Sequence, residues 1–204
     1  MAYETQPAFV STGTWNATTR SHPAMKWMEH YTTTTIDGRQ FAGPSPASAT
    51  SVGHTADWTL QKSTGEVVEG AEKAWVALAE VYAPFAAHVH DPVFLVCWET
   101  AKGWDMLGIA SLWYNLQAPG EGKIKGFGGE EWDGVLPSEY PQSWHHRWEG
   151  SVLIRCVPGA FKFSYVKGGK DGVELARTEI YSDPSAALVQ MLKRGMLTPE
   201  QLMQ

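Results

Sequence analysis

One amphipathic helix followed by a long β-rich stretch is the sequence feature that most constrains the fold. Between residues 71 and 87, apolar side chains recur at steps of three and four residues, at Trp75, Leu78, Val81, Tyr82 and Phe85. This spacing predicts a helix with one buried face. Pro84 lies inside the pattern and is expected to kink or loosen the last turn. The segment from His88 to Pro92 is expected to end the helix.

The segments after this helix are apolar and predict long strands. Residues 93–100 and 104–116 are almost entirely apolar, which is typical of strands covered on both faces. The turn Ala101-Lys102-Gly103 joins them as a hairpin. Further strands are expected at 55–60, 65–70, 151–156, 160–167 and 173–181, with helices starting at Ser21 and covering 186–194. This order predicts an α+β fold in which an antiparallel sheet curls around a helix.

The length of 204 residues suits a single domain. We expect an N-terminal arm over 1–20, one domain over 21–195 and a tail over 196–204. Residues 118–150 form a long irregular insertion, which is usually a functional lid or a mobile segment. Its aromatic side chains also suit an oligomer contact.

Charge and composition exclude several classes of protein. Only 19% of the residues are charged, the net charge is -6, and no block of Lys or Arg is present, so we expect no nucleic-acid partner. No apolar run approaches the roughly 20 residues of a membrane span. The first residues lack the pattern of a signal peptide and there are 2 Cys, so we expect a cytoplasmic protein. The 10 Trp, 7 Tyr and 7 Phe indicate a large core, a pocket or an interface.

Several short motifs resemble the nuclear-transport-factor-2-like superfamily in their order and spacing. They are Ala56-Asp57-Trp58-Thr59-Leu60, then Gly65-Glu66-Val67 and Gly70, then a helix ending in His, and finally Asp171-Gly172-Val173 with the stretch from Arg177 to Pro184. The chain looks most like the SnoaL-like branch of fungal natural-product pathways. The resemblance covers about residues 25–194, interrupted by the insertion.

The resemblance implies a cone, in which a strongly bent antiparallel sheet is closed by helices around an apolar pocket. Members include polyketide cyclases, scytalone dehydratase, ketosteroid isomerase and epoxide hydrolases, and others only bind ligands or partners. The fold alone therefore does not settle function, and the site residues must be argued separately.

His88 and His90 are the first candidates for catalysis. Side chains two apart in an extended segment share a side, so both could face one cavity. Imidazole suits proton transfer near neutral pH. The resemblance adds that scytalone dehydratase has a catalytic His on the strand after the equivalent helix. The alternative is that one His caps the helix and the other is a surface residue.

Three more residues are candidates for acid–base roles. Asp57, beside Trp58, would become a base if aromatic walls desolvated it, and otherwise it is an exposed strand residue. Tyr31 and Asn115 could hydrogen-bond a developing oxyanion. Asn115 falls near the place where scytalone dehydratase has a second pocket His, and this departure weakens a dehydratase interpretation.

A set of mostly aromatic side chains is expected to bind the substrate. Glu99 lies in an apolar strand, either at the sheet edge or facing a cavity. The full set is Trp27, Trp58, Phe85, Trp98, Glu99, Trp113, Tyr114, His145, His146 and Trp148. We expect Trp75 to belong to the core instead. Tyr82 could donate a hydrogen bond to a substrate oxygen, but its place on an amphipathic helix favours the core.

We expect neither a metal nor a cofactor. His88 and His90 could be joined by Asp91 and the pair His145-His146 as metal ligands, but no zinc or two-metal signature is present. The glycines at 126, 128 and 129 precede no helix, so they do not form a dinucleotide-binding loop.

Three hypotheses remain at this point. The first is a cofactor-independent isomerase, cyclase or dehydratase acting by general acid–base catalysis on a hydrophobic polycyclic or aromatic natural-product intermediate. The second is a protein of the same fold that binds a small hydrophobic ligand, or serves in assembly, without chemistry. The third is a homo-oligomer, a dimer before a trimer, whose aromatic residues serve mainly the interface.

Overall fold

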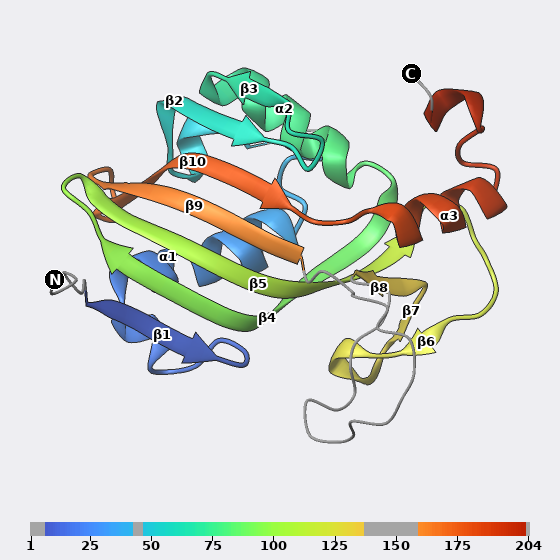
Figure 1. The fold of residues 1–204 in the computed structure, drawn as a ribbon, viewed down its shortest axis with the longest axis horizontal. Helices are drawn as coiled ribbons and strands as arrows, with labels where there is room; N and C mark the ends of the chain where they lie inside the picture. Colours follow the sequence, from blue (N-terminus) through green and yellow to red (C-terminus); the bar gives the residue numbers. More distant parts are fainter. Residues whose placement is uncertain (1–6, 43–46, 137–158, 203–204) are drawn as a thin grey trace, which may run out of the picture.

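The computed structural model describes residues 7–42, 47–136 and 159–202, and its main feature is a strongly curved, mostly antiparallel sheet (Figure 1). The strand order is β1-β4-β5-β9-β10-β2-β3, and β8 pairs with β5 beside this path. The strands are β1 (Ala8–Thr12), β2 (His54–Gln61), β3 (Val67–Glu69), β4 (Phe85–Glu99), β5 (Gly103–Leu116), β8 (Gly134–Leu136), β9 (Gly159–Lys167) and β10 (Val173–Tyr181). Only the β10–β2 pairing is parallel among these pairs.

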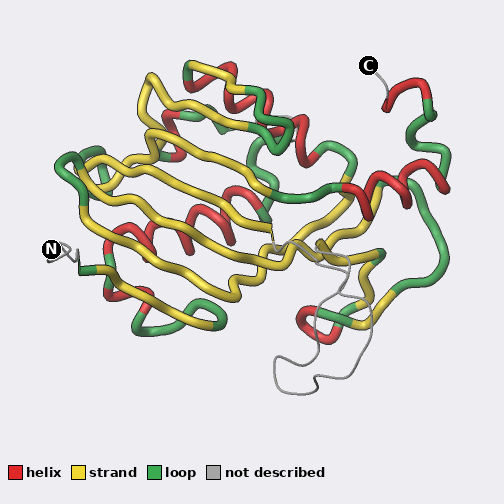
Figure 2. The backbone as a smooth tube through the Cα atoms, in the orientation of Figure 1, coloured by secondary structure: helices red, strands yellow, loops and turns green. Residues whose placement is uncertain are grey.

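Helices cover the concave face of this sheet (Figure 2). They are α1 (Pro23–His30), which continues as a π-helix over Tyr31–Ile36, and α2 (Ala71–Tyr82), which packs on β2. The third helix, α3 (Ser185–Lys193), lies beside β8, beyond the end of the main sheet (Figure 1). Short 3-10 turns are found at Thr19–Ser21, Thr50–Val52, Phe127–Gly129 and Glu200–Leu202. The predicted α+β class, with a curved antiparallel sheet around helices, is confirmed.

The expected N-terminal arm contributes to the sheet. Ala8–Thr12 pairs antiparallel with β4, so that Phe9 lies opposite Cys97 on the inner face. On the outer face, Val10 lies opposite Val96 and is 57% exposed. The short run of alternating side chains is too brief to be recognised as a strand in an otherwise polar segment.

The predicted helix over 71–87 is shorter than expected, because α2 ends at Tyr82. Pro84 has no amide hydrogen to continue the helix. Instead, the Arg39 guanidinium donates hydrogen bonds to the carbonyls of Tyr82, at 3.3 Å, and Phe85, at 2.5 Å, closing the helix end. The chain from Phe85 onward is strand β4, so His88 and His90 belong to this strand and not to the end of a helix.

A β-bulge in β4 sets which side chains face inward. The register against β5 shifts between Pro92 and Phe94, and a bulge accommodates a proline that cannot donate a ladder hydrogen bond. Before the bulge, even-numbered residues such as His88 and His90 are buried, and after it Leu95 and Cys97 are buried. The bulge therefore turns both histidines and the apolar half of the strand toward the same interior.

The threonine-rich segment that follows α1, Tyr31–Ile36, is a π-helix. The amides of Asp37 and Gln40 donate to the carbonyls of Thr32 and Thr35, five positions earlier, at 2.8 and 2.9 Å. π-turns of this kind are rare and frequently occur at functional sites. The wider turn buries Tyr31, Thr32 and Ile36 and leaves Asp37 at its C-terminal end.

The first part of the predicted insertion is structured. Residues 118–136 contain the small hairpin of β6 (Ile124–Lys125) and β7 (Glu131–Trp132), followed by β8 on the main sheet. Asp133 fixes this segment, because its carboxylate accepts hydrogen bonds from the Leu116 amide and the Arg194 guanidinium, at 2.7 and 2.8 Å. The predicted site residues His145, His146 and Trp148, and the predicted strand over 151–156, lie outside the described residues.

No helix in the described parts of the chain is long and apolar enough to cross a membrane.

Candidate functional site

A small apolar cavity lies between the concave face of the sheet and the helices. It offers about 60 Å³ to the centres of water-sized molecules. The polar side chains on its wall are Tyr31, Thr32, Tyr82, His90 and Thr178. The remaining wall is mainly aromatic and aliphatic, and includes Trp15, Met28, Ile36, Leu78, Leu95, Met106, Phe161, Phe163 and Ile180.

His90 is held on this wall by a carboxylate from the π-helix end. Asp37 Oδ1 lies 2.7 Å from His90 Nδ1, and Asp37 Oδ2 accepts the backbone amide hydrogen of His90 at 3.2 Å. With Asp37 ionised, His90 Nδ1 carries the hydrogen and donates a hydrogen bond to the carboxylate. The other ring nitrogen, Nε2, is then free of a proton and can act as a base.

The hydroxyl of Tyr82 contacts this second nitrogen. The two atoms, Tyr82 Oη and His90 Nε2, are 3.1 Å apart, and the hydroxyl donates to the unprotonated nitrogen. Burial raises the pKa of Tyr82, and the nearby negative charge of Asp37 raises it further. Tyr82 therefore stays protonated and remains a hydrogen-bond donor on the cavity wall.

His88 is buried beside this pair but does not line the cavity. Its ring stacks on Tyr82, with centroids 4.4 Å apart, and its Nε2 is 3.8 Å from Asp37 Oδ1. Neither ring nitrogen has a hydrogen-bond partner among the described residues. Burial lowers the pKa of His88 to about 3, helped by the charges of His90 and Arg39, while the backbone of Ile36 opposes this shift. The ring is therefore neutral at pH 7.

A second buried histidine, His54, forms a hydrogen bond with the hydroxyl of Tyr31. His54 Nδ1 is 3.0 Å from the Ala49 carbonyl oxygen, so it donates there, and Nε2 accepts the Tyr31 hydroxyl hydrogen at 2.9 Å. Burial lowers the pKa of His54 to about 3. The Tyr31 side chain therefore lines the cavity, but its hydroxyl already donates its hydrogen bond to His54 and is not available to a substrate.

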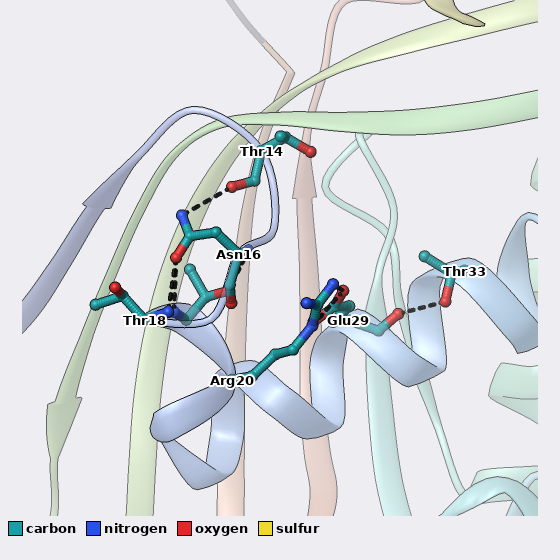
Figure 3. A network of polar contacts seen from close by, with 7 residues as sticks. Thr14, Asn16, Thr18, Arg20, Glu29 and Thr33 are labelled. Atoms are coloured by element: carbon teal, nitrogen blue, oxygen red, sulfur yellow. Dashed lines mark hydrogen bonds and ion pairs between the residues drawn. The ribbon is translucent and has the colours of Figure 1, made fainter.

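The N-terminal loop brings Trp15 to the cavity. Asn16 Oδ1 accepts the amide hydrogens of Thr18 and Thr19, at 2.8 and 3.2 Å (Figure 3). One turn further on, Arg20 forms a two-nitrogen ion pair with Glu29 of α1, with the shortest N–O distance at 2.6 Å. These contacts fix the loop after β1 against the helix.

Of the five predicted catalytic residues, the structure brings His90 and Tyr31 to the cavity wall and His88 next to it. Asp57 is exposed on β2, on the strand face opposite Trp58, so the expectation of aromatic walls around its carboxyl is wrong. Asn115 does not line the cavity. Its side chain accepts the Asp133 amide hydrogen at 2.9 Å and so holds the segment that leads to β8.

Most predicted substrate-binding residues lie in the core or on other surfaces. Trp58 is fully buried against His54, with ring centroids 3.9 Å apart, and donates to Thr178. Trp27 stacks on Tyr31 outside the cavity wall. Trp98, opposite Ala8 and Asp105, belongs to the outer face of the sheet.

The other members of that set are placed as follows. Glu99 is exposed at the end of β4, near the β4–β5 turn, and pairs with Lys167; β4 lies between β1 and β5 and is not an edge strand. Phe85 and Tyr114 contact each other, with centroids 5.2 Å apart, and Phe85 lines a second small cavity next to the first. Trp113 lies close to Gly126 of the insertion.

Sequence reasoning missed Asp37 and assigned Tyr82 to the core. Asp37 precedes His90 by 53 positions in the sequence. The π-helix brings the Asp37 carboxylate next to the His90 ring, and no sequence pattern predicts a π-helix. Tyr82 is both core and wall, and its 8-residue separation from His90 gives no periodic signal because a helix changes into a strand between them.

Comparison with known proteins gives a fold and no activity. No protein-family model matches the sequence, and no curated protein is similar to it. The crystal structure of the Kfla4162 protein from Kribbella flavida is similar, with a TM-score of 0.51 and 16% identity over 82% of this chain and 93% of that one. An uncharacterized protein with a cystatin-like fold from Caulobacter vibrioides has a TM-score of 0.44 and 11% identity, covering 84% and 96% of the two chains. We draw on the first alone, and it shows a shared fold.

Proposed function

We propose that this protein is a cofactor-independent enzyme that moves a proton on a small hydrophobic carbonyl compound by general acid–base catalysis. The observation that carries the proposal is the chain Asp37–His90–Tyr82 on the wall of an apolar cavity. The motifs that resemble the SnoaL-like branch support the same class of chemistry. The rival hypothesis, binding without chemistry, is weakened because an ionisable side chain lines the cavity.

His90 supplies the base. Its Nε2 takes the proton from a carbon next to the substrate carbonyl, and the ring becomes an imidazolium. The C–H electron pair forms a new C=C bond while the π pair of the carbonyl moves onto its oxygen, which gives an enolate. In a β,γ-unsaturated carbonyl compound this enolate is a conjugated dienolate, so returning the proton from His90 to the γ-carbon moves the double bond, completes an isomerisation and regenerates His90. An oriented base of this kind contributes typically about 10²- to 10⁴-fold.

Asp37 and Tyr82 support this step in different ways. The Asp37 carboxylate fixes the His90 tautomer and stabilises the imidazolium through the 2.7 Å hydrogen bond. When substrate occupies the space in front of Nε2, the Tyr82 hydroxyl turns its hydrogen bond to the enolate oxygen. Tyr82 thus takes the role that the sequence analysis gave to Tyr31 or Asn115.

The cavity limits the size of the substrate. Its volume of about 60 Å³ is well below the roughly 150 Å³ of an engineered cavity that binds benzene. A polycyclic intermediate therefore does not fit, and a single ring also needs the neighbouring cavity of about 90 Å³, which shares Tyr82, Ala110 and Phe161 with the first. We propose a single ring or a short branched chain that extends across both cavities, with its carbonyl at the Tyr82–His90 end and its apolar part along Phe161.

Deuterium exchange tests this function without knowledge of the natural substrate. Metal-free protein is incubated in D₂O with cyclohexanone and with acetophenone, and loss of the α-proton signal is followed by NMR. We expect exchange faster than with free imidazole at equal concentration, and at least about 10²-fold slower exchange in His90→Gln. Asp57→Asn is the matched control, because Asp57 is exposed and outside the cavity. Equal rates in wild type and His90→Gln would contradict the proposal.

A further inference from the structure

The side chains of Asp37, His88 and His90 offer three potential metal ligands in one place. One carboxylate oxygen and one nitrogen from each imidazole lie within 4.8 Å of one another. The two histidines point to the same side of β4, with ring centroids 5.7 Å apart. We propose that these three residues bind a divalent transition metal ion of the Zn²⁺ type, a site distinct from the acid–base role of His90 Nε2.

The unsatisfied nitrogens of His88 are the second observation for this site. The His88 residue is 2% exposed, yet neither ring nitrogen has a partner at full hydrogen-bond geometry among the described residues, and the backbone of Ile36 is the group that comes nearest to this role. A buried imidazole without well-aligned partners forfeits the hydrogen bonds that it would make in water. Its Nε2 is 3.8 Å from Asp37 Oδ1, so a metal ion bound to that carboxylate could also coordinate this nitrogen.

The distances between the three ligand atoms are close to those of a metal site. In a tetrahedral zinc site with bonds of about 2.0–2.2 Å, neighbouring ligand atoms are roughly 3.3–3.6 Å apart. Asp37 Oδ1 is 2.7 Å from His90 Nδ1 and 3.8 Å from His88 Nε2, values on either side of this range. A metal ion would replace the proton between Asp37 and His90 and widen that pair by less than about 1 Å.

The chemistry of the ligand set also points to a transition metal. Two imidazoles and one carboxylate suit Zn²⁺, Fe²⁺ or Co²⁺ better than Mg²⁺ or Ca²⁺, which prefer oxygen ligands. Three protein ligands leave a position for water, as in catalytic zinc sites. Among the described residues the carboxylate that joins the two histidines is that of Asp37, while the other candidate ligands His145 and His146 lie outside the described residues.

This inference does not rest on the proposed function. A metal ion on His90 Nδ1 and Asp37 removes the hydrogen bond that fixes the His90 tautomer, so bound metal is expected to suppress the proton-transfer step. His88 has no role in that step. Its substitution therefore separates the two proposals.

Metal titration of the full-length protein tests the site. Zn²⁺ is titrated in competition with a chromophoric chelator, and Co²⁺ is followed by its visible absorption. We expect one equivalent to bind to wild type, and at least about 10-fold weaker binding in His88→Phe and in Asp37→Asn. His88→Phe keeps a ring stacked on Tyr82 and removes both unsatisfied nitrogens, so the fold should survive, which thermal unfolding checks.

The matched control is His30→Phe, at an exposed histidine of α1 outside the site, which keeps all three proposed ligands. X-ray absorption of the zinc-loaded wild type provides a measurement that needs no variant, and two imidazoles and one carboxylate are expected. The inference is overturned by no binding to wild type, by unchanged affinity in folded His88→Phe, or by loss of binding in the control. Under each of these results the exchange assay on metal-free protein can still succeed.

Discussion

Asp37 holds His90 through both carboxylate oxygens, with Oδ1 2.7 Å from the ring Nδ1 and Oδ2 3.2 Å from the backbone amide nitrogen. The two contacts fix the ring orientation and the strand position together. A π-helix and the strand that follows α2 are thus joined at the point where the strand meets the cavity.

Removing the Tyr82 hydroxyl separates its two roles. In Tyr82→Phe the ring packing against Phe41 and His88 is retained, while the 3.1 Å hydrogen bond to His90 is lost. We expect the free energy of unfolding, measured in urea, to fall by about 1 kcal/mol, because one buried hydrogen bond is lost. Exchange of the ketone α-proton should slow about 10-fold or more, since the enolate loses its donor. A variant that is folded and exchanges as fast as wild type would remove Tyr82 from the mechanism.

Filling the cavity should block ligands without unfolding the protein. Ala110 is half-buried and lines the cavity, so Ala110→Leu places three further carbon atoms near the cavity space. Binding of cyclohexanone, followed by NMR line broadening, should weaken at least about 10-fold, while the cost of overpacking stays within about 1–3 kcal/mol. Ala86→Leu, at an exposed position of β4, is the control and should bind as wild type does.

Buried neutral histidines predict a loss of stability in acid. The pKa of His54 is lowered to about 3 by burial, below its ordinary value of 6.5. Above pH 6.5 the folded and unfolded forms are both neutral, and its contribution is fully present. Below that pH the unfolded chain takes up the proton first, so stability falls by up to about 1.4 kcal/mol per pH unit until the folded pKa is reached.

Comparison of two variants isolates this effect from the titration of carboxylates. Between pH 5.5 and 4.5, His54→Asn should lose about 1 kcal/mol less stability than wild type in urea unfolding. Asparagine at 54 keeps a donor for the Ala49 carbonyl, and His30→Asn, at an exposed position, serves as control. An acid loss in His54→Asn as large as that of wild type would show that His54 is not the titrating group.

The loop that carries Trp15 should loosen when Asn16 is truncated. Asn16→Ala removes the acceptor for the Thr18 and Thr19 amides, a capping loss of about 1 kcal/mol. Hydrogen-exchange mass spectrometry should show faster exchange over residues 14–21 while β9 and β10 stay protected. Unchanged protection of the loop would mean that Trp15 is held by packing alone.

The sequence patterns that succeed are those with a single dominant period. The apolar strand over 104–116 and the alternating strand over 173–181 match β5 and β10 within a residue or two, because burial and alternation along a strand are local properties. The end of α2 was overestimated, since Phe85 fits the helical spacing by coincidence while Pro84 stops the helix.

The site was only partly predictable, for physical reasons that involve distant residues. His88 and His90 were identified from their spacing, which depends on neighbouring residues of one strand. Asp37 needs the π-helix and the β4 bulge to meet them, and both are departures from regular periods. The sequence analysis expects the Tyr31 hydroxyl to hydrogen-bond an oxyanion. Its partner is His54, 23 positions away, and no sequence pattern links the two residues.

The expectation of a homo-oligomer stays a prediction. The outer face of β4 and β5 carries the partly exposed apolar side chains Phe94, Val96, Trp98, Leu107 and Ile109. If a second copy covers this face, light scattering gives twice the monomer mass, and Leu107→Asp returns it to the monomer. A wild-type monomer would remove the expectation.

The tautomer of His90 tests the central claim most directly. Nitrogen-15 NMR of metal-free protein at pH 7, assigned with His90→Gln, reports which ring nitrogen carries the proton. We predict a protonated Nδ1 bonded to Asp37 and an unprotonated Nε2 facing Tyr82, with the Nε2 signal shifting when cyclohexanone is added. A proton on Nε2, or a signal that ignores the ligand, would contradict a base poised on the cavity wall.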